Sequence, residues 1–327
     1  MTATRQLAER HRFRWWELVP WIAGVAVFFA FPNYLSFGTQ VLITILFALS
    51  LDLVLGYAGI VTLGHAAFFG VGAYTVGMMA MHWGWNEPLS GLVAAALVAG
   101  AIGLASGLVL LRTRGLTLLM LTLCTMALLE QAANMGAAWT GGFDGMPGLS
   151  FEKILGLFSF DALYFRSQYL YSLVVLLACF VLVRALIYSS FGQSLTGIRE
   201  NLLRMHAVGA PVRARLVAAY TISAALAGLA GGLYTQTTGY VNLSVLGLER
   251  AAGVLIVLIL GGYGRLYGAF VGAIAYMVLE HLLAKAYPTA WQLGIGLTLM
   301  AVALYARNGI LGLGDALRRR LGAGGTR

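Results

Sequence analysis

Long apolar runs limit this chain to very few architectures. Segments 89–111 and 173–186 are long and carry almost no charge. The interior of a bilayer offers no hydrogen-bond partner to backbone N–H and C=O groups, so a chain crosses it as helices or as a closed barrel. Only helices require apolar runs of about 20 residues. These segments therefore predict helices that span a membrane.

The composition supports the same fold class. Apolar residues make up 60% of the 327 residues and charged residues 10%, against about 45–50% and about 25% in soluble globular proteins. The 42 glycines allow close contacts between helices in a bilayer. We expect an all-α integral membrane protein with about ten transmembrane helices, at approximately 19–36, 38–57, 60–82, 90–111, 116–136, 169–187, 216–236, 248–263, 267–286 and 291–307.

The basic residues predict how these spans are oriented. Placing the arginine-rich segment 1–18 in the cytoplasm puts most of the 21 basic residues on that side, as the positive-inside rule requires. Orientation thus explains the net charge of +9 without a nucleic-acid partner. The expected organisation is a cytoplasmic basic amino terminus (1–18), a single membrane domain (19–312) with an outside loop at 137–168 and an inside loop at 188–215, and a cytoplasmic basic tail (313–327).

Two segments contain too much glycine for simple spanning helices. Residues 56–72 read GYAGIVTLGHAAFFGVG, and residues 261–268 read GGYGRLYG. Irregular backbone at membrane depth persists only where it is buried in protein or lines a wet cavity. The first segment predicts a broken or re-entrant helix, and both predict walls of a solute path. The candidate path residues in them are Gly64, His65, Phe68, Gly70, Gly261 and Gly262.

His65 has a second interpretation. A single histidine in a membrane segment is more often a hydrogen-bonded packing residue than a ligand. Cys124 and Cys179 lie in apolar segments with no second cysteine or histidine at ligand spacing. The sequence therefore predicts no metal site.

Ionisable groups inside a bilayer are typical of ion-coupled carriers. Glu130 and Asn134 belong to a polar patch near the outer end of the fifth predicted span and are further candidates for the solute path. The alternative for Glu130 is an interfacial carboxylate that only bonds neighbouring helices. Asp52 and Glu280 lie near span ends, where water is expected to reach them.

The chain lacks the motifs of an enzyme. A P-loop needs the pattern GxxxxGK[ST] to hold phosphates, and neither Lys153 nor Lys285 follows it. The patterns HExxH, GxSxG and CxxC are absent as well. We therefore expect no catalytic residue, no metal and no directly bound cofactor, with any use of ATP left to partner subunits.

The inside loop contains the sequence QSLTGIRENLLRMHAVGAP. Its apolar residues recur at i, i+4 and i+7 and its charged residues face elsewhere, which predicts one short amphipathic helix at the membrane surface. We interpret this helix as a docking element whose apolar side chains enter a groove of a cytoplasmic partner. A helix that only caps the bundle is the alternative. The candidate contact residues are Ile198, Arg199, Glu200, Leu202, Met205 and Gly209.

Four stretches resemble the LivM-type permeases of branched-chain amino-acid ABC importers. LDLVLGYAGIVTLGHAAFFGVGAY at 51–74 is the most specific, and TGGFDGMPG at 140–148 is similar to an outside-loop motif of that family. FGQSLTGIRENLLRMHAVGAPVRARLVAAYTISAALAGLAGGLY at 191–234 and LILGGYGRLYGAFVGA at 258–273 are similar to its coupling loop and its last block. The resemblance runs from about Leu46 to Gly312.

This resemblance implies a helical fold of the type II ABC importer class in a bacterial inner membrane. It implies a heterodimer with a LivH-type permease, two cytoplasmic ATPase subunits that use ATP, and a periplasmic binding protein that delivers a small solute. Loop 137–168 is then periplasmic, and loop 188–215 is the cytoplasmic coupling loop, with its contact at Ile198, Arg199, Glu200 and Gly209.

The function expected from the resemblance is import of branched-chain or related small amino acids by alternating access. Permeases for urea or short amides share much of the same framework and remain an alternative. Two other classes are an ion-coupled secondary transporter and a membrane scaffold without solute flux.

Overall fold

The structure is a computed structural model that describes residues 19–151, 165–288, 291–305, 309–310 and 312. The expected basic amino terminus (1–18) and basic tail (313–327) lie outside these residues. Within them the fold is helical, and the only β pairing is an isolated antiparallel bridge between Met146 and Val241. The predicted all-α class is confirmed.

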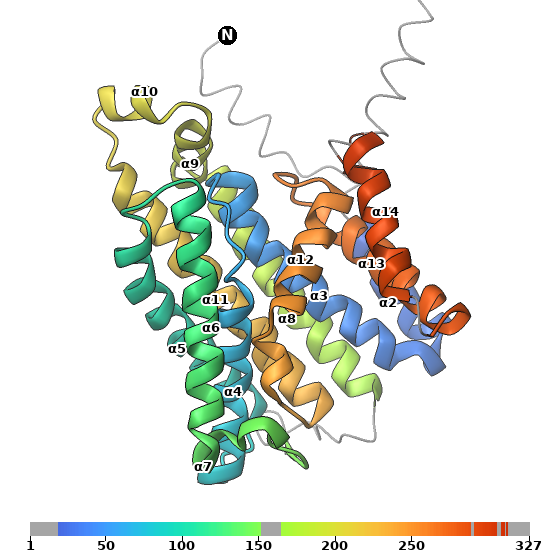
Figure 1. Ribbon diagram of the computed structural model, residues 1–327. Coiled ribbons are helices and arrows are strands. Elements are labelled where there is room, and N and C mark those ends of the chain that lie inside the picture. The colour runs from blue at the N-terminus through green and yellow to red at the C-terminus, as the bar shows by residue number, and fades with distance from the viewer. Residues whose placement is uncertain (1–18, 152–164, 289–290, 306–308, 311, 313–327) are drawn as a thin grey trace, which may run out of the picture.

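The long helices form two groups (Figure 1). One group contains α4 (Ala66–Trp83), α5 (Pro88–Leu110), α6 (Leu116–Met135) and α11 (Val212–Thr238), with α11 packed against α4 and α5. The other contains α2 (Val19–Ala30), α12 (Leu248–Gly261), α13 (Gly268–Ala286) and α14 (Trp291–Tyr305). Between them run α3 (Leu35–Asp52) and α8 (Phe165–Tyr188), with α3 in contact with α11, α12 and α13.

Small residues allow the first group to pack closely. A side chain at Gly72 of α4 would collide with the backbone of Gly228 in α11, and one at Gly231 would collide with the carbonyl oxygen of Phe69. In a bilayer no water-driven force joins helices, so close backbone contact supplies much of the attraction. Several of the glycines in the sequence therefore serve helix packing.

Seven helices in the described residues are long and apolar enough to cross a membrane. One of these spans, Leu243–Gly261, is formed by η5 (Leu243–Val245) and α12 together. The helix α2 has 12 residues and α14 has 15, which is shorter than the roughly 20 residues of a simple span. The expected count of about ten spans is therefore not confirmed, whereas a multi-pass helical bundle is.

The predicted break after the second span is present. The helix α3 ends at Asp52 and continues as a π-helical turn, η3 (Leu53–Tyr57), after which residues 58–65 are not helical. Regular helix resumes at Ala66 with α4. The prediction of irregular backbone over 56–72 is thus right up to residue 65. It is wrong for residues 66–72, which form regular helix.

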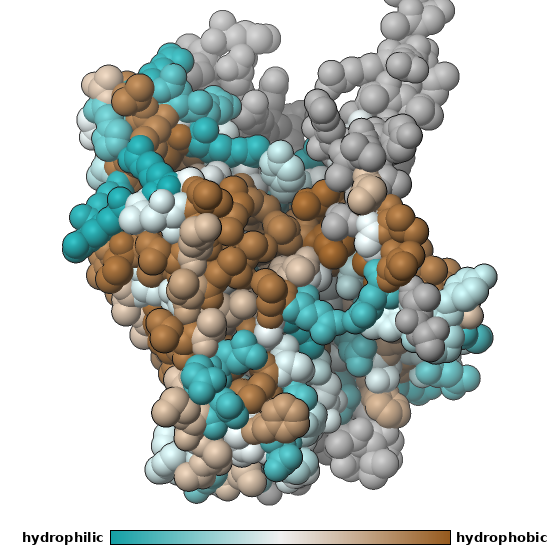
Figure 2. All heavy atoms as spheres, viewed as in Figure 1, coloured by the Kyte–Doolittle hydropathy of each residue, from teal (hydrophilic) through white to brown (hydrophobic). Residues whose placement is uncertain are grey.

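The two ends of the bundle differ. One end, called the α9 end below, carries α9 (Ser190–Glu200) and α10 (Leu202–Ala207), and the opposite end carries α7 (Ala137–Thr140) and η4 (Gly142–Asp144). Figure 2 shows a broad hydrophobic area over the front of the bundle and mostly hydrophilic residues toward the α9 end. Hydrophilic side chains also cross this face beside the start of α12 (Figure 2).

The described part of loop 137–168 is held by backbone hydrogen bonds. The amide of Met146 donates to the carbonyl oxygen of Val241 at 2.8 Å, and the amide of Leu149 donates to that of Gly239 at 3.0 Å. Both bonds tie the loop to the segment after α11. Residues 152–164 of this loop lie outside the described residues.

Candidate functional site

Arg199 of α9 reaches two irregular segments at the α9 end. One of its guanidinium nitrogens donates to the carbonyl oxygen of Gly56 in η3. The guanidinium carbon lies 5.5 Å from the ring centre of Tyr263, within range of a cation–π interaction. Tyr263 belongs to the glycine-rich turn 262–267 between α12 and α13. A single side chain thus connects α9 to the ends of both α3 and α12.

Asp52 completes this arrangement. Its Oδ1 accepts a hydrogen bond from the amide of Gly264 at 2.6 Å, while its Oδ2 has no hydrogen-bond partner among the described residues. The side chain is only 1% exposed, so the expectation that water reaches Asp52 is wrong. A buried carboxylate is costly unless polar or charged groups surround it, and Arg199 supplies the nearby positive charge. We call Asp52, Gly56, Arg199, Tyr263 and Gly264 the junction.

Glycine is required at two positions around Arg199. Gly59 and Gly264 have φ angles of +72° and +74°, which side-chain-bearing residues rarely adopt. A Cβ at Gly59 would lie 2.9 Å from Cγ of Arg199, and one at Gly264 would lie 2.9 Å from a guanidinium nitrogen. The glycines that make both segments irregular therefore also leave room for the arginine.

The inside loop forms two helices where one was predicted. The helix α9 ends at Glu200, and Asn201 adopts an extended conformation with φ −154° and ψ 99°. The side chain of Asn201 then accepts a hydrogen bond from the amide of Arg204 at 3.0 Å and so caps α10. The prediction of a single amphipathic helix is wrong because this capping residue restarts the chain in a new direction.

The break changes which apolar side chains are accessible. Ile198 is 3% exposed and packs inside this chain, and Met205 of α10 lies over Gly197. Ile198 is therefore not available as the expected anchor in a partner's groove. Leu203 and Val208 are instead 81% and 76% exposed.

The other predicted contact residues of this loop differ in exposure. Arg199 and Glu200 are exposed at the end of α9, and Leu202 is half-buried at the start of α10. Gly209 has a φ of +81° with no atom within 4 Å of a built Cβ, and it ends the loop before α11. The coupling role of these residues stays a prediction.

His65 is a packed and hydrogen-bonded residue. Its Nε2 lies 2.9 Å from the hydroxyl of Ser50 and 3.4 Å from that of Ser223, and its ring stacks on Phe47 at 5.7 Å. The side chain is 1% exposed. These contacts join α3, α4 and α11. They agree with the packing interpretation of His65, and a role in the solute path stays a prediction.

The neighbours of His65 are packed just as tightly. A side chain at Gly64 would collide with the carbonyl oxygen of Thr122, and one at Gly70 would collide with Leu246. The ring of Phe68 lies edge-on against Tyr220 at 5.4 Å. None of Gly64, His65, Phe68 and Gly70 lines the pocket described below, whereas Phe69 does.

The remaining candidates for the solute path are dispersed. Glu130 and Asn134 lie on α6 and do not line the pocket. Gly261 and Gly262 lie at the end of α12, where a side chain at Gly261 would collide with the backbone of Gly268. The structure thus places these two glycines beside the junction, apart from the α6 residues.

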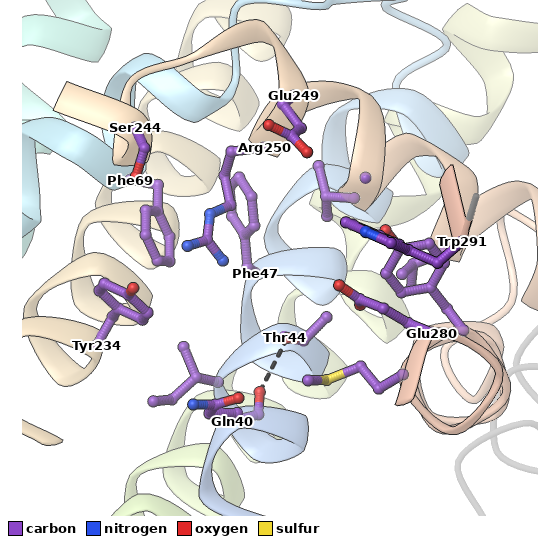
Figure 3. A pocket seen from close by; sticks show the side chains of 16 residues that line it. Gln40, Thr44, Phe47, Phe69, Tyr234, Ser244, Glu249, Arg250, Glu280 and Trp291 are labelled. Carbon is purple, nitrogen blue, oxygen red and sulfur yellow. Dashed lines mark hydrogen bonds between the residues drawn. The ribbon is translucent and has the colours of Figure 1, made fainter. Parts of the chain in front are cut away.

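A pocket of about 330 Å³ lies between α3, α11, α12 and α13 (Figure 3). Its apolar wall is formed by aliphatic and aromatic side chains that include Ile43, Phe47, Phe69, Tyr234, Val254 and Val257. Its polar lining includes Gln40, Thr44, Ser244, Glu249, Arg250 and Glu280. The pocket therefore combines a hydrophobic surface with side chains of both charges.

The charged groups occupy different walls. The guanidinium carbon of Arg250 lies 4.9 Å from the ring centre of Tyr234 and 5.3 Å from that of Phe69. Figure 3 shows the carboxylate of Glu280 on the opposite side, directed into the pocket, and Glu249 above. Glu249 is exposed and accepts a hydrogen bond from Gln292 at 3.3 Å. The geometry presents one cation and one half-buried carboxylate to the same space.

Comparison with known protein families shows which family this chain belongs to. The model of a family described as "Branched-chain amino acid transport system / permease component" matches residues 33–304. The chain belongs to this permease family. Among the described residues, no group of three or more His, Cys, Asp or Glu side chains could hold a metal ion.

Individual relatives of this permease are also transport proteins. The high-affinity branched-chain amino acid transport system permease protein LivM of Salmonella typhimurium (strain LT2) is 28% identical over 292 residues, which cover 80% of this chain and 67% of that protein. The autoinducer 2 import system permease protein LsrC of Enterobacter sp. (strain 638) is 31% identical over 297 residues, 84% of this chain and 81% of LsrC. The permease protein LivH of Escherichia coli (strain K12) is 24% identical over 279 residues. No solved structure matches the chain significantly.

Sequence reasoning missed several residues that this permease gathers at the two sites. Glu249 and Arg250 are adjacent opposite charges at the start of an apolar run. Glu280 was expected only as a residue near a span end, and it is half-buried within α13. Charges at such positions mark functional sites in membrane proteins. The charged residues in these apolar runs are visible in the sequence, but the sequence does not show which of them face one another.

Proposed function

We propose that the chain is the permease subunit of an ATP-driven importer that moves branched-chain or related small amino acids across the inner membrane by alternating access. One observation carries the proposal beyond family membership. The helices α3 and α12 both line the pocket, and both end in the junction that holds Arg199 of α9. A displacement of α9 can therefore reach the pocket through two continuous helices.

The path from junction to pocket is short along both helices. In α3, the pocket residue Phe47 precedes Asp52 by less than two helical turns. In α12, the pocket residue Val257 precedes Gly261 by about one turn. Packed helices move as rigid bodies and switch between discrete arrangements. Such a movement would open the pocket alternately toward the two sides of the membrane.

The α9 end is the cytoplasmic side in this proposal. The positive-inside rule places the arginines of loop 188–215 there, together with both termini and the segments 1–18 and 313–327. The loop 137–168 is then periplasmic, where a binding protein would deliver the solute. A LivH-type permease would complete the pair of permease subunits, since this chain also resembles LivH.

Two cytoplasmic ATPase subunits supply the work in this proposal, and one of them docks on α9 and α10. Leu203 in α10 and Val208 just after it have largely exposed apolar side chains. Large exposed apolar side chains next to charged ones are typical of protein interfaces. The short helices would then fit a groove of the ATPase, with Arg199 linking that contact to the junction.

The solute class is tested by growth. A leucine-auxotrophic bacterium without its own branched-chain amino-acid uptake should grow on micromolar leucine when it expresses this chain with its LivH-type, ATPase and binding-protein partners. Omitting only this chain should abolish growth and uptake of labelled leucine. Uptake of labelled urea without leucine uptake would instead favour the amide permease, and flux of neither solute would contradict the proposal.

A further inference from the structure

We propose that the pocket is a binding site at which the permease itself holds a zwitterionic α-amino acid. The guanidinium of Arg250 binds the α-carboxylate, and the carboxylate of Glu280 binds the α-ammonium group. The inference rests on the proposed function and deepens it, because it assigns the solute contacts to named residues of this chain.

Among the described residues, no anion is bonded to Arg250. Within the residues that the structure describes, its guanidinium forms no hydrogen bond and no ion pair, and its contacts are the rings of Phe69 and Tyr234. A charge inside a membrane protein is expensive unless it is paired, and an unpaired one marks a functional site. The two rings hold the guanidinium in place while its N–H groups remain free to bind a planar anion.

Glu280 is the better partner for an ammonium group than Glu249. Glu249 is exposed and already accepts a hydrogen bond from Gln292. Glu280 is half-buried, forms no hydrogen bond within the described residues, and is close enough to Arg250 for electrostatic interaction. Figure 3 shows its carboxylate directed into the pocket from the wall opposite Arg250.

Opposite charges on two walls select among ligand classes. A zwitterion satisfies both groups, because a guanidinium forms paired hydrogen bonds with a carboxylate and a carboxylate accepts from an ammonium group. A neutral amide, urea or a sugar would leave both charges unmatched, at a cost in desolvation. The walls therefore favour an α-amino acid over those solutes.

The rest of the pocket fits an aliphatic side chain. Ile43, Val254 and Val257 line it and are buried in the bundle, next to Phe47. The volume of about 330 Å³ lies at the small end of the range of roughly 300–1,000 Å³ for ligand pockets. A solute of the size of leucine or valine, with its charged end between Arg250 and Glu280, matches these dimensions.

Three ligands test the proposal on the unmodified protein. The complete permease–ATPase complex is placed in lipid nanodiscs without binding protein or ATP, and displacement of labelled leucine is measured. Leucinamide lacks the carboxylate and 4-methylpentanoate lacks the ammonium group, so each should bind at least about tenfold more weakly than leucine. Equal affinity for all three, or no leucine binding at all, would overturn the proposal.

Variants then assign the two contacts. Arg250→Gln and Glu280→Gln should each weaken leucine binding at least about tenfold, and Arg250→Gln should remove the preference for leucine over leucinamide. Arg114→Gln, an exposed arginine outside the pocket, is the matched control and should bind leucine normally. Unchanged leucine affinity in both pocket variants would overturn the assignment.

The proposed function fails by a different result. Leucine binding to the pocket is measured without ATP. If no binding is found there, leucine transport by the complete transporter still supports the proposed function. Conversely, absence of leucine uptake by the unmodified transporter would contradict the proposed function, whatever the nanodisc experiment shows.

Discussion

Replacing Arg199 with alanine is expected to separate ATP hydrolysis from transport in the complete reconstituted transporter. The substitution removes the hydrogen bond to the Gly56 carbonyl and the contact with Tyr263, and it leaves the buried Asp52 without its nearby positive charge. A hydrogen bond to a charged group is worth about 1.5–3 kcal/mol. The number of leucine molecules imported per ATP hydrolysed should therefore fall about tenfold or more.

Two comparisons make the Arg199 experiment specific. Arg114→Ala removes an exposed arginine that lies outside α9, α10 and the junction, and it should keep the normal ratio. Arg199→Lys keeps the charge but loses the planar donor set, so an intermediate ratio is expected. A normal ratio of transport to hydrolysis in Arg199→Ala would show that the junction does not carry the coupling.

The double substitution Leu203→Asp with Val208→Asp is expected to detach an ATPase subunit from the permease pair. Both side chains are largely exposed, so the change should leave the fold of this chain intact. In the proposed complex they are covered by the ATPase, and two carboxylates buried in an apolar interface would cost several kcal/mol. The affinity for the ATPase should fall about a hundredfold or more, measured by co-purification and by titration of labelled ATPase.

The control for this experiment lies at the opposite end of the bundle. His82→Asp adds a negative charge at an exposed position of α4, beside Trp139 of α7, and should leave ATPase binding close to normal. Retention of both ATPases by the double variant, at the affinity of the unmodified protein, would show that they dock elsewhere on the permease.

Local signals in the sequence predicted the broken segment correctly. Glycines at 56, 59 and 64 with a histidine beside them are incompatible with a plain span, and the structure is irregular from Leu53 to His65. The same reasoning extended the break too far, because Gly70 and Gly72 remain helical and serve contacts with Leu246 and Gly228. Glycine in a membrane segment indicates close packing as well as a break, and the sequence does not separate the two uses.

The break at Asn201 could have been predicted from the capping preference of asparagine, but the apolar periodicity favoured a continuous helix. Apolar spacing runs through residues 198–205 without interruption, which favoured one helix. Asparagine is a preferred first capping residue, and here it ends α9 and starts α10. Because Asn201 caps α10, the backbone changes direction there. This change determines which apolar side chains are exposed.

The pocket depends on contacts that no local pattern contains. Arg250 and Glu280 are thirty positions apart, and they meet only because α12 and α13 pack antiparallel beside α3. A list of spans gives neither the neighbours of a helix nor its rotation about its axis, both of which are set by packing. For the same reason Asp52 was expected at a wet span end, although the turn 262–267 covers it.

The most direct test of the account is leucine flux through proteoliposomes that contain both permease subunits, with and without the two ATPases. The account predicts accumulation of labelled leucine only when the ATPases, ATP and the binding protein are all present. It predicts block by vanadate and persistence after ionophores dissipate proton and sodium gradients. Gradient-driven leucine accumulation by the permease pair alone would contradict it and would identify an ion-coupled carrier.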